Sequence, residues 1–553
     1  MARYILQWTS VMAIVMTFGS ADALGQPPSQ AKLPEATAEM AIKIDPALIS
    51  QLDQVWTVIG SPKNPVWPGW DARDTPVLIY FPDRQDVLIN HPKPPEGFKR
   101  YTGPLKSALG PIHIRDGKTI TSFDGQNTAI DVGGVQTLVV ADTLSARRQW
   151  AESVAAAAKG DPANAKAQID SGLVPNPYPA FRLFAHEAFH VYQHKRAPGK
   201  APRETALLAY PSLSVENNVG FALEAEFLHA ALEAEGKDAA VPHLKKWLAA
   251  RSMRRANLSQ EAIDYEDATE FSEGTAVYVE YRLTQCLEGT APLDKLWLIQ
   301  GFQGFKDLSS ERAGMRARMR GMMSGRVPVN NDLYGASPVR FRLYFSGMAI
   351  AASLDRLGAR WHDKVFDPTV TLTGLLSAEL KVKPEELGAE VKGIRAGAPF
   401  ADLTRQKTAL ENDGKAHIAA AVAAFDRAAG ELVIDYARVR KPAVGFVYTS
   451  FGILRVADHQ SLYRLIPISG TVGAFKFAED AARPVFHDAE AKRIRVQLTG
   501  KPDPADLAKQ IGAELTADRH IDLAKLTVPG VTLNGVKGTV RLDGKRLTLV
   551  LDE

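Results

Sequence analysis

The feature that most constrains this chain is the run His186-Glu187-Ala188-Phe189-His190, which has the pattern H-E-x-x-H. On an α-helix, residues four apart lie on the same face, so the imidazoles of His186 and His190 can bind one metal ion. Glu187 can then reach a water on that metal and take its proton as a general base. The run therefore predicts a metal centre on a helix, with a base beside it.

The neighbouring residues favour a buried helix from Pro179 to His194. Proline near the first turn and Pro198-Gly199 after the last turn are helix start and stop signals. Apolar side chains on nearly every side of the helix indicate burial, and they are Phe181, Phe184, Ala185, Ala188, Phe189 and Val191. Burying two imidazoles and a carboxylate costs on the order of several kcal/mol unless something binds them. A core helix with merely hydrogen-bonded histidines is the alternative.

A zinc site that performs hydrolysis has three protein ligands and one open position, so a third ligand must come from another element. Glu273 heads a helical run, in which Gly274 and Ala276 are small enough to allow close packing. We therefore expect Glu273 to be the third ligand. Glu270, one turn earlier, is expected to support a ligand histidine by fixing its tautomer. The alternative is that Glu270, Glu273 and Glu280 form a solvated acidic face.

A second candidate for the third ligand is Glu224, which lies inside an apolar stretch of the helix expected between the two motifs. His194 is two turns beyond His186, too far along the axis to reach the same ion. The sequence leaves the choice between Glu224 and Glu273 open.

The first residues have the pattern of a secretory signal peptide. Arg3 precedes a short apolar run that ends near Phe18, and Ala21-Asp22-Ala23 is a small-x-small cleavage site. We expect residues 1–23 to be removed, the mature chain to be periplasmic or extracellular, and no stable membrane span to remain. Cys286 is the single cysteine, so an intramolecular disulfide is excluded and the apolar core must hold the fold.

The distribution of residue types predicts an α+β protein with three regions. Residues 24–141 are β-rich, with runs such as Val77–Phe81, and residues 142–430 have helical spacing. Residues 431–553 return to short strands punctuated by glycine and proline. The formal net charge of +3, with basic residues scattered among acidic ones, argues against a nucleic-acid partner.

The combination of H-E-x-x-H with Glu273 in an E-G-x-A-x-Y context resembles the gluzincin zinc metallopeptidases. The segment from Leu343 to Gly358 is similar to the tyrosine segment of the aminopeptidase N group. That resemblance implies that Tyr344 donates a hydrogen bond to the oxyanion that forms during hydrolysis. Tyr344 as an ordinary core aromatic is the alternative, and Tyr334 is another candidate for the donor.

The chain departs from the aminopeptidase N group in one respect. That group has a Gly-x-Met-Glu-Asn strand, whose glutamate binds the free amino end of the substrate. The nearest analogue here, Gly133–Gln136, carries no acid. The role of an edge strand that pairs with substrate backbone could survive in this segment, whereas recognition of a free amino end would not. The resemblance therefore favours an endopeptidase or oligopeptidase over an aminopeptidase.

The resulting hypothesis is a zinc metallopeptidase with one Zn²⁺ per chain, held by His186, His190 and Glu273, that acts on a peptide or protein. Glu187 is its general base and Tyr344 stabilises the oxyanion. Two alternatives remain: a non-catalytic exported binding or scaffold protein with a zinc site, and a zinc hydrolase of a non-peptide amide or ester. Glu187 favours catalysis because a purely structural zinc helix needs no base beside its first ligand. The sequence does not indicate an oligomeric state.

Overall fold

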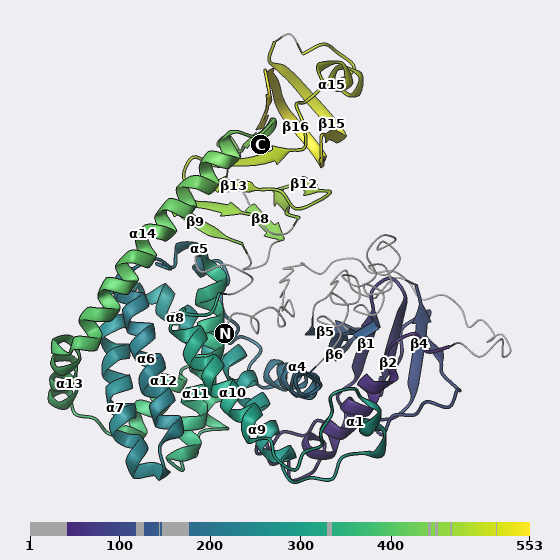
Figure 1. Cartoon of the computed structure of the whole chain (residues 1–553). Coiled ribbons are helices and arrows are strands. Elements are labelled where there is room, and N and C mark those ends of the chain that lie inside the picture. Colours follow the sequence, from purple (N-terminus) through teal and green to yellow (C-terminus); the bar gives the residue numbers. More distant parts are fainter. Residues whose placement is uncertain are drawn as a thin grey trace, which may run out of the picture. The chain divides into compact units, whose positions relative to one another are not determined.

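The computed structural model describes residues 41–117, 127–142, 144–145, 176–328, 335–440, 444–447, 452–464, 467–515 and 517–552. The predicted signal peptide and Tyr334 lie outside these ranges. The fold class is α+β as predicted, with sheets near both ends of the chain and helices between them (Figure 1).

The chain divides into two compact units, each built from separate stretches of sequence. Unit 1 contains the described residues up to Ala201, together with Phe271–Ala317 and Gly358–Leu372. Unit 2 contains Pro202–Glu270, Arg318–Leu357 and the described residues from Thr373 onward. The sequence predicts domains at residues 24–141, 142–430 and 431–553, and these limits stay a prediction. Each compact unit combines stretches from more than one of these regions.

Unit 1 contains a six-stranded sheet with the order β3-β4-β2-β1-β6-β5. Its strands are β1 (Val77–Phe81), β2 (Gln85–Ile89), β3 (Lys99–Arg100), β4 (Ile112–Asp116), β5 (Thr128–Val132) and β6 (Val135–Ala141). All neighbours are antiparallel except β1 and β6, which are parallel. Helix α1 (Pro46–Ile59) packs against α4 (Tyr178–Arg196), which in turn contacts β5 and β6.

The segment Gly133–Gln136 forms a turn and the first residues of β6, and its pairing with substrate backbone stays a prediction. Gly133 and Gly134 have φ values of 60° and 86°, and they form the turn that folds β5 back onto β6. Strand β6 lies between β1 and β5 in the sheet order, with Val135–Val139 paired to β5 and Leu138–Ala141 paired to β1. The outermost strand on this side of the sheet is β5.

Helix α4 is anchored in unit 1 by aromatic side chains. Trp67 is fully buried, and its ring lies 4.5 Å from that of Phe189 and 5.0 Å from that of Trp361. On another side of the helix, the ring of Phe181 lies 5.3 Å from that of Phe305. Aromatic pairs at these distances contribute about 0.5–1.5 kcal/mol each beyond the apolar area they bury. The histidine-bearing helix is thus fixed by rigid neighbours.

The remaining helices of unit 1 come from its second and third stretches of sequence, Phe271–Ala317 and Gly358–Leu372. Helix α9 (Thr275–Leu287) packs along α4 and continues from a π-helical turn, η1 (Glu270–Gly274). The short 3₁₀ helices are η2 (Asp294–Leu298) and η3 (Lys364–Phe366). Helix α10 (Ser309–Met323) crosses the boundary between the units in sequence.

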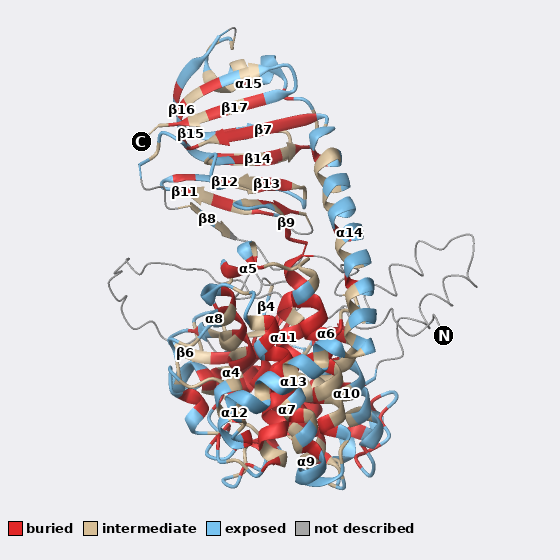
Figure 2. Ribbon diagram, turned by 90° about the vertical axis from the view of Figure 1, so that its left-hand side faces the viewer, coloured by how far each residue is buried: buried red, intermediate tan, exposed pale blue. Residues whose placement is uncertain are grey.

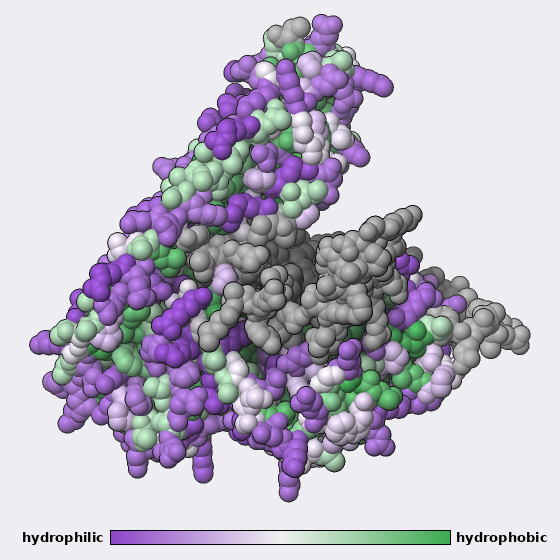
Figure 3. Space-filling model, in the orientation of Figure 1, coloured by the Kyte–Doolittle hydropathy of each residue, from purple (hydrophilic) through white to green (hydrophobic). Residues whose placement is uncertain are grey.

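Unit 2 combines a group of helices with a C-terminal sheet. Its helices are α5 (Ala206–Ala209), α6 (Val215–Glu233), α7 (Gly236–Arg255), α8 (Gln260–Thr269), α11 (Ala336–Arg356), α12 (Leu372–Leu380), α13 (Pro384–Ala396) and α14 (Ala398–Asp426). Helix α11 is buried along most of its length, whereas α13 and α14 expose many residues (Figure 2). The visible surface of this helical part is largely hydrophilic, with scattered apolar residues (Figure 3).

The C-terminal sheet has eleven strands, of which ten follow the order β8-β11-β12-β16-β17-β7-β14-β13-β10-β9, while β15 pairs with β16. The strands are β7 (Gly430–Asp435), β8 (Val444–Val447), β9 (Leu454–Ala457), β10 (Gln460–Tyr463), β11 (Ser469–Val472), β12 (Phe475–Glu479), β13 (Val485–Asp488), β14 (Arg493–Leu498), β15 (Arg519–Val528), β16 (Val531–Asp543) and β17 (Arg546–Leu551). Helix α15 (Pro504–Ile511) lies between β14 and β15 in the sequence. The pair β7 and β17 is parallel and the other pairs are antiparallel.

Across the described ranges, none of the helices combines the length and the apolar character that crossing a lipid bilayer requires.

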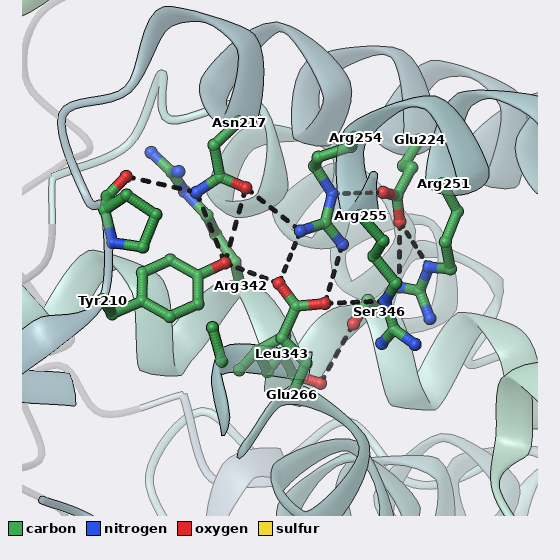
Figure 4. Close-up of polar contacts among 12 residues, drawn as sticks. Tyr210, Asn217, Glu224, Arg251, Arg254, Arg255, Glu266, Arg342, Leu343 and Ser346 are labelled. Carbon is green, nitrogen blue, oxygen red and sulfur yellow. Dashed lines mark hydrogen bonds and ion pairs between the residues drawn. The ribbon is translucent and has the colours of Figure 1, made fainter. Parts of the chain in front are cut away.

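The helices of unit 2 enclose a network of buried ion pairs (Figure 4). Glu224 on α6 accepts hydrogen bonds from Arg251, at 2.8 Å, and from Arg254, at 2.6 Å. Arg251 also binds both oxygens of Glu270, and Arg254 binds both oxygens of Glu266. Because each carboxylate meets at least one guanidinium with good geometry, the buried charges are compensated inside the unit.

We predict that Glu266→Gln destabilises unit 2 because it leaves the buried Arg254 short of a counter-charge. The expected loss is about 3–5 kcal/mol of unfolding free energy at pH 7. Burial acts to raise the pKa of Glu266, but Arg254 and Arg255 lower it to about 2. The stabilisation should therefore be complete above pH about 4.5 and disappear as the pH falls toward 2.

Urea unfolding of the parent and the variant at several pH values measures this effect. Glu261→Gln, an exposed position on the same helix, is the control and should leave the unfolding midpoint unchanged. Equal stability of all three proteins at pH 7 would contradict the prediction.

Candidate metal centre

Unit 1 brings His186, His190 and Glu273 together. One ligand atom from each lies within 4.8 Å of the others. Glu273 Oε2 lies 3.6 Å from Nε2 of His186 and 3.6 Å from Nε2 of His190. Two ligands that are each about 2.0–2.1 Å from a tetrahedral ion lie about 3.4 Å apart. The spacing of the carboxylate to both imidazoles is thus close to that of a tetrahedral metal site.

The helix on which both histidines lie is the one that the sequence predicts. It runs from Tyr178 to Arg196, has Pro179 in its first turn, and carries basic side chains in its last turn. His186 is fully buried, whereas the side chain of His190 is 19% exposed. The group is therefore accessible to solvent on the His190 side and closed on the other.

Both imidazoles are oriented through their Nδ1 atoms. His186 Nδ1 lies 2.7 Å from Glu280 Oε1, and His190 Nδ1 lies 2.7 Å from Gln193 Oε1. A carboxylate or amide oxygen can only accept, so each Nδ1 carries a proton and Nε2 is the nitrogen left to bind a metal ion. This tautomer is the one that metal-binding histidines need when they coordinate through Nε2.

A π-helical turn, Glu270–Gly274, separates the roles of two neighbouring carboxylates. In a regular α-helix, residues three apart differ by about 60° around the axis. The wider π turn increases the angle between Glu270 and Glu273. Glu273 consequently joins the histidines in unit 1, whereas Glu270 binds Arg251 and Ser346 in unit 2.

Gln193 connects the histidine helix to this π turn. Its Nε2 donates to the carbonyls of Phe271, at 3.0 Å, and Ser272, at 2.9 Å, and to Thr275 Oγ1, at 2.8 Å. Its Oε1 accepts from His190. A π turn leaves carbonyls without their usual i+4 partners, and Gln193 supplies donors to two of them. One buried amide thus orients a candidate ligand and supports the backbone that carries Glu273.

The residues fit a divalent cation such as zinc. Nε2 of His186 is buried and forms no hydrogen bond, and Oε1 of Glu187 is in the same situation. Leaving such buried polar atoms without a partner costs about 1–3 kcal/mol each. A donor set of two imidazole nitrogens and one carboxylate oxygen matches the three protein ligands of catalytic zinc sites.

The electrostatics of the group also favour a bound cation. Burial acts to lower the pKa of His186, but Glu273 and Glu280 raise it to about 10. Burial raises the pKa of Glu187 to about 7, and the nearby histidines oppose this shift. The carboxylates of Glu187, Glu273 and Glu280 therefore favour a positive charge at His186. Either a proton or a metal ion on Nε2 can supply that charge.

Glu224 does not lie with the histidines. It is fully buried in unit 2, where Arg251 and Arg254 occupy both of its oxygens. The structure thus places Glu273, and not Glu224, beside His186 and His190. Glu224 lies in an apolar stretch because it is buried, and its partners there are two arginines of α7. The local sequence of α6 does not identify these partners.

The expectation that Glu270 supports a ligand histidine is wrong. Glu280 takes that position, seven residues after Glu273 and so on nearly the same face of the helix. The seven-residue spacing of Glu273 and Glu280 could have identified Glu280 from the sequence, because residues two helical turns apart lie on the same face of a helix. Gln193 carried no comparable signal, because its partners come from a distant π turn.

Tyr344 belongs to unit 2. It is buried, its hydroxyl accepts a hydrogen bond from Arg340 Nε at 3.2 Å, and its ring stacks on Phe341. These contacts describe a packed aromatic side chain with a satisfied hydroxyl. Its role as an oxyanion donor stays a prediction.

Comparison with known proteins gives no match: no family model, no curated protein and no solved structure is significantly similar to the chain. The resemblance to gluzincins consequently rests on the short motifs and on the geometry of the group.

We predict that Glu273→Gln lowers zinc binding sharply, because an amide is a much weaker ligand than a carboxylate. Glu224→Gln should retain zinc but lose about 3–5 kcal/mol of stability, because it leaves two buried arginines underpaired. Elemental analysis after gel filtration, together with urea unfolding, measures both effects. Zinc loss in Glu224→Gln with zinc retained in Glu273→Gln would reverse the assignment.

A further pair of variants tests Gln193. Gln193→Leu removes all four of its hydrogen bonds and should weaken zinc binding by about 10–100-fold. Gln193→Glu keeps an acceptor for His190 but loses the donors to the π turn, so its effect separates the two roles. Competition with a chromophoric chelator measures the affinity. His194→Ala, an exposed change on the same helix, is the control, and equal affinities in all four proteins would exclude a positioning role.

Proposed function

We propose that this chain is an exported zinc-dependent metallopeptidase of the gluzincin type. The observation that carries the proposal is the convergence of His186, His190 and Glu273, with Glu187 adjacent on the same helix. A helix that bound zinc only for structure would need no buried carboxylate next to its first ligand. The protein is expected to be periplasmic or extracellular after removal of residues 1–23.

In this proposal the chain's own residues perform three tasks. Nε2 of His186, Nε2 of His190 and a carboxylate oxygen of Glu273 would hold the ion. Glu280 and Gln193 keep a proton on each Nδ1, so that both Nε2 atoms would be the ones to bind the ion. Zinc, when bound, lowers the pKa of a water to about 7 and polarises a carbonyl. Glu187 would accept a proton from the attacking water and would deliver it to the leaving amine.

A peptide is the proposed substrate because the sheet beside α4 offers an edge. Strand β5 is outermost in its sheet, and α4 contacts both β5 and β6. An extended peptide can add to such an edge through main-chain hydrogen bonds, which are independent of its side chains. Because the segment at Gly133–Gln136 has no acid for a free amino end, an endopeptidase or oligopeptidase is favoured over an aminopeptidase. Tyr344 remains the proposed oxyanion donor.

The test compares the mature chain with Glu187→Gln. Both should contain about one zinc, because Glu187 is not a proposed ligand. The variant should cleave a mixed library of quenched fluorescent peptides about 10²–10⁴-fold more slowly, because general-base catalysis contributes that much.

Other results lead to different conclusions. Zinc in both proteins without cleavage by either would favour a binding or scaffold protein, or a hydrolase of a non-peptide amide or ester. Ester and non-peptide amide substrates separate these last two. Absence of zinc from a parent chain purified without chelators would refute the proposal.

A further inference from the structure

Unit 2 contains two buried cations that are not part of the ion-pair network. Arg342 on α11 is 2% exposed and Lys407 on α14 is 7% exposed. Lys407 is unusual on α14, which otherwise exposes most of its polar residues to solvent (Figure 2). In the described part of the chain, no carboxylate forms an ion pair with either of them.

Both cations face the end of α10. Lys407 Nζ donates to the carbonyl of Ser324 at 2.6 Å. Arg342 Nη2 lies 2.7 Å, and Lys407 Nζ 3.7 Å, from the position that a Cβ on Gly325 would occupy. Real Cβ contacts are longer than 2.7 Å, so the absence of a side chain at Gly325 is what lets Arg342 Nη2 lie against the end of α10, with Lys407 Nζ beside it.

One edge of the Arg342 guanidinium is available for binding. Its Nη1 donates to Asn218 Oδ1 at 2.6 Å, which accounts for the opposite side of the group. Its Nε is buried and has no hydrogen-bond partner. Nε and Nη2 together form the edge with which arginine binds a carboxylate or phosphate through two parallel hydrogen bonds.

The end of α10 compensates only a fraction of this charge. Gly325, with φ of 68°, and Arg326 close the helix through hydrogen bonds to the carbonyls of Met322 and Gly321. A helix C-terminus carries about half a negative elementary charge. The charge of the two cations therefore exceeds the charge at the end of the helix.

The consequence is visible in the ionisation of both groups. Burial lowers the pKa of Arg342 to about 10, with Tyr210 opposing this shift and Arg254 adding to it. Burial also lowers the pKa of Lys407 to about 8, with Arg342 and Arg326 acting in the same direction. Arg342 nonetheless stays charged at neutral pH, inside a protein and without a carboxylate partner.

We propose that Arg342, Lys407 and Gly325 form a binding site for a small oxyanion of the phosphate or carboxylate class. The oxyanion accepts two hydrogen bonds from the Nε and Nη2 edge of Arg342 and one from Lys407 Nζ. It supplies the counter-charge for the buried cations and links α11 to α14. This site lies in unit 2 and is independent of the metal centre proposed in unit 1.

The test measures binding of inorganic phosphate and of acetate to the full chain by calorimetry, and thermal unfolding in either anion against chloride at equal ionic strength. Saturable binding of one anion per chain, with a rise in Tm, is the expected result. The anion that binds more tightly identifies the class. Lys407→Met should weaken this binding at least tenfold.

Two further variants complete the design. Lys415→Met removes a lysine from the same helix whose side chain is 64% exposed, and it should bind the anion like the parent. Arg342→Met should abolish binding, and Lys407→Met carries the test if Arg342→Met does not fold. Equal responses of the parent and Lys407→Met would indicate an adventitious ion only and would overturn the proposal, as would stabilisation no greater than that in chloride.

Discussion

The arrangement of the metal centre depends on the contact between α4 and the helix formed by η1 and α9. Glu280 and Gln193 form this contact from opposite directions, since one reaches from α9 to His186 and the other from α4 to the π turn. Each hydrogen bond also selects an imidazole tautomer. Glu280 and Gln193 therefore determine both how these helices pack and which imidazole nitrogens can bind a metal ion. A change in either side chain affects both.

The sequence was sufficient to predict the helix that carries H-E-x-x-H, the α+β class and the association of Glu273 with the histidines. These features follow from local patterns: helical spacing, start and stop signals, and small residues beside a glutamate. The role of Gln193 was not predictable, because it depends on two backbone carbonyls that become available only in a π turn. The ion pairs of Glu224 were also hidden, since its partners lie on a neighbouring helix and not on its own.

The edge of the first sheet illustrates a similar limit. The β-branched and other apolar residues from Val135 to Val140 predict a strand after Gly133-Gly134, and β6 does form there. Strand order is a property of long-range pairing, and the parallel contact between β1 and β6 places β6 inside the sheet. The glycines that resembled the start of an edge strand are instead the turn of a hairpin. The local sequence thus predicts that the strand exists, but it does not predict the place of the strand in the order of the sheet.

The parallel contact between β7 and β17 has a consequence for how the chain reaches its final state. β7 is the first strand of the C-terminal sheet and β17 the last, and β17 lies between β16 and β7. The sheet therefore cannot be completed until Arg546–Leu551 has been synthesised. Pairing of such distant segments is slow, because a long loop must close first. During synthesis, the edges of β7 and β16 that β17 later covers would remain open to other extended segments, so the sheet is most exposed to mispairing before Arg546–Leu551 has been made.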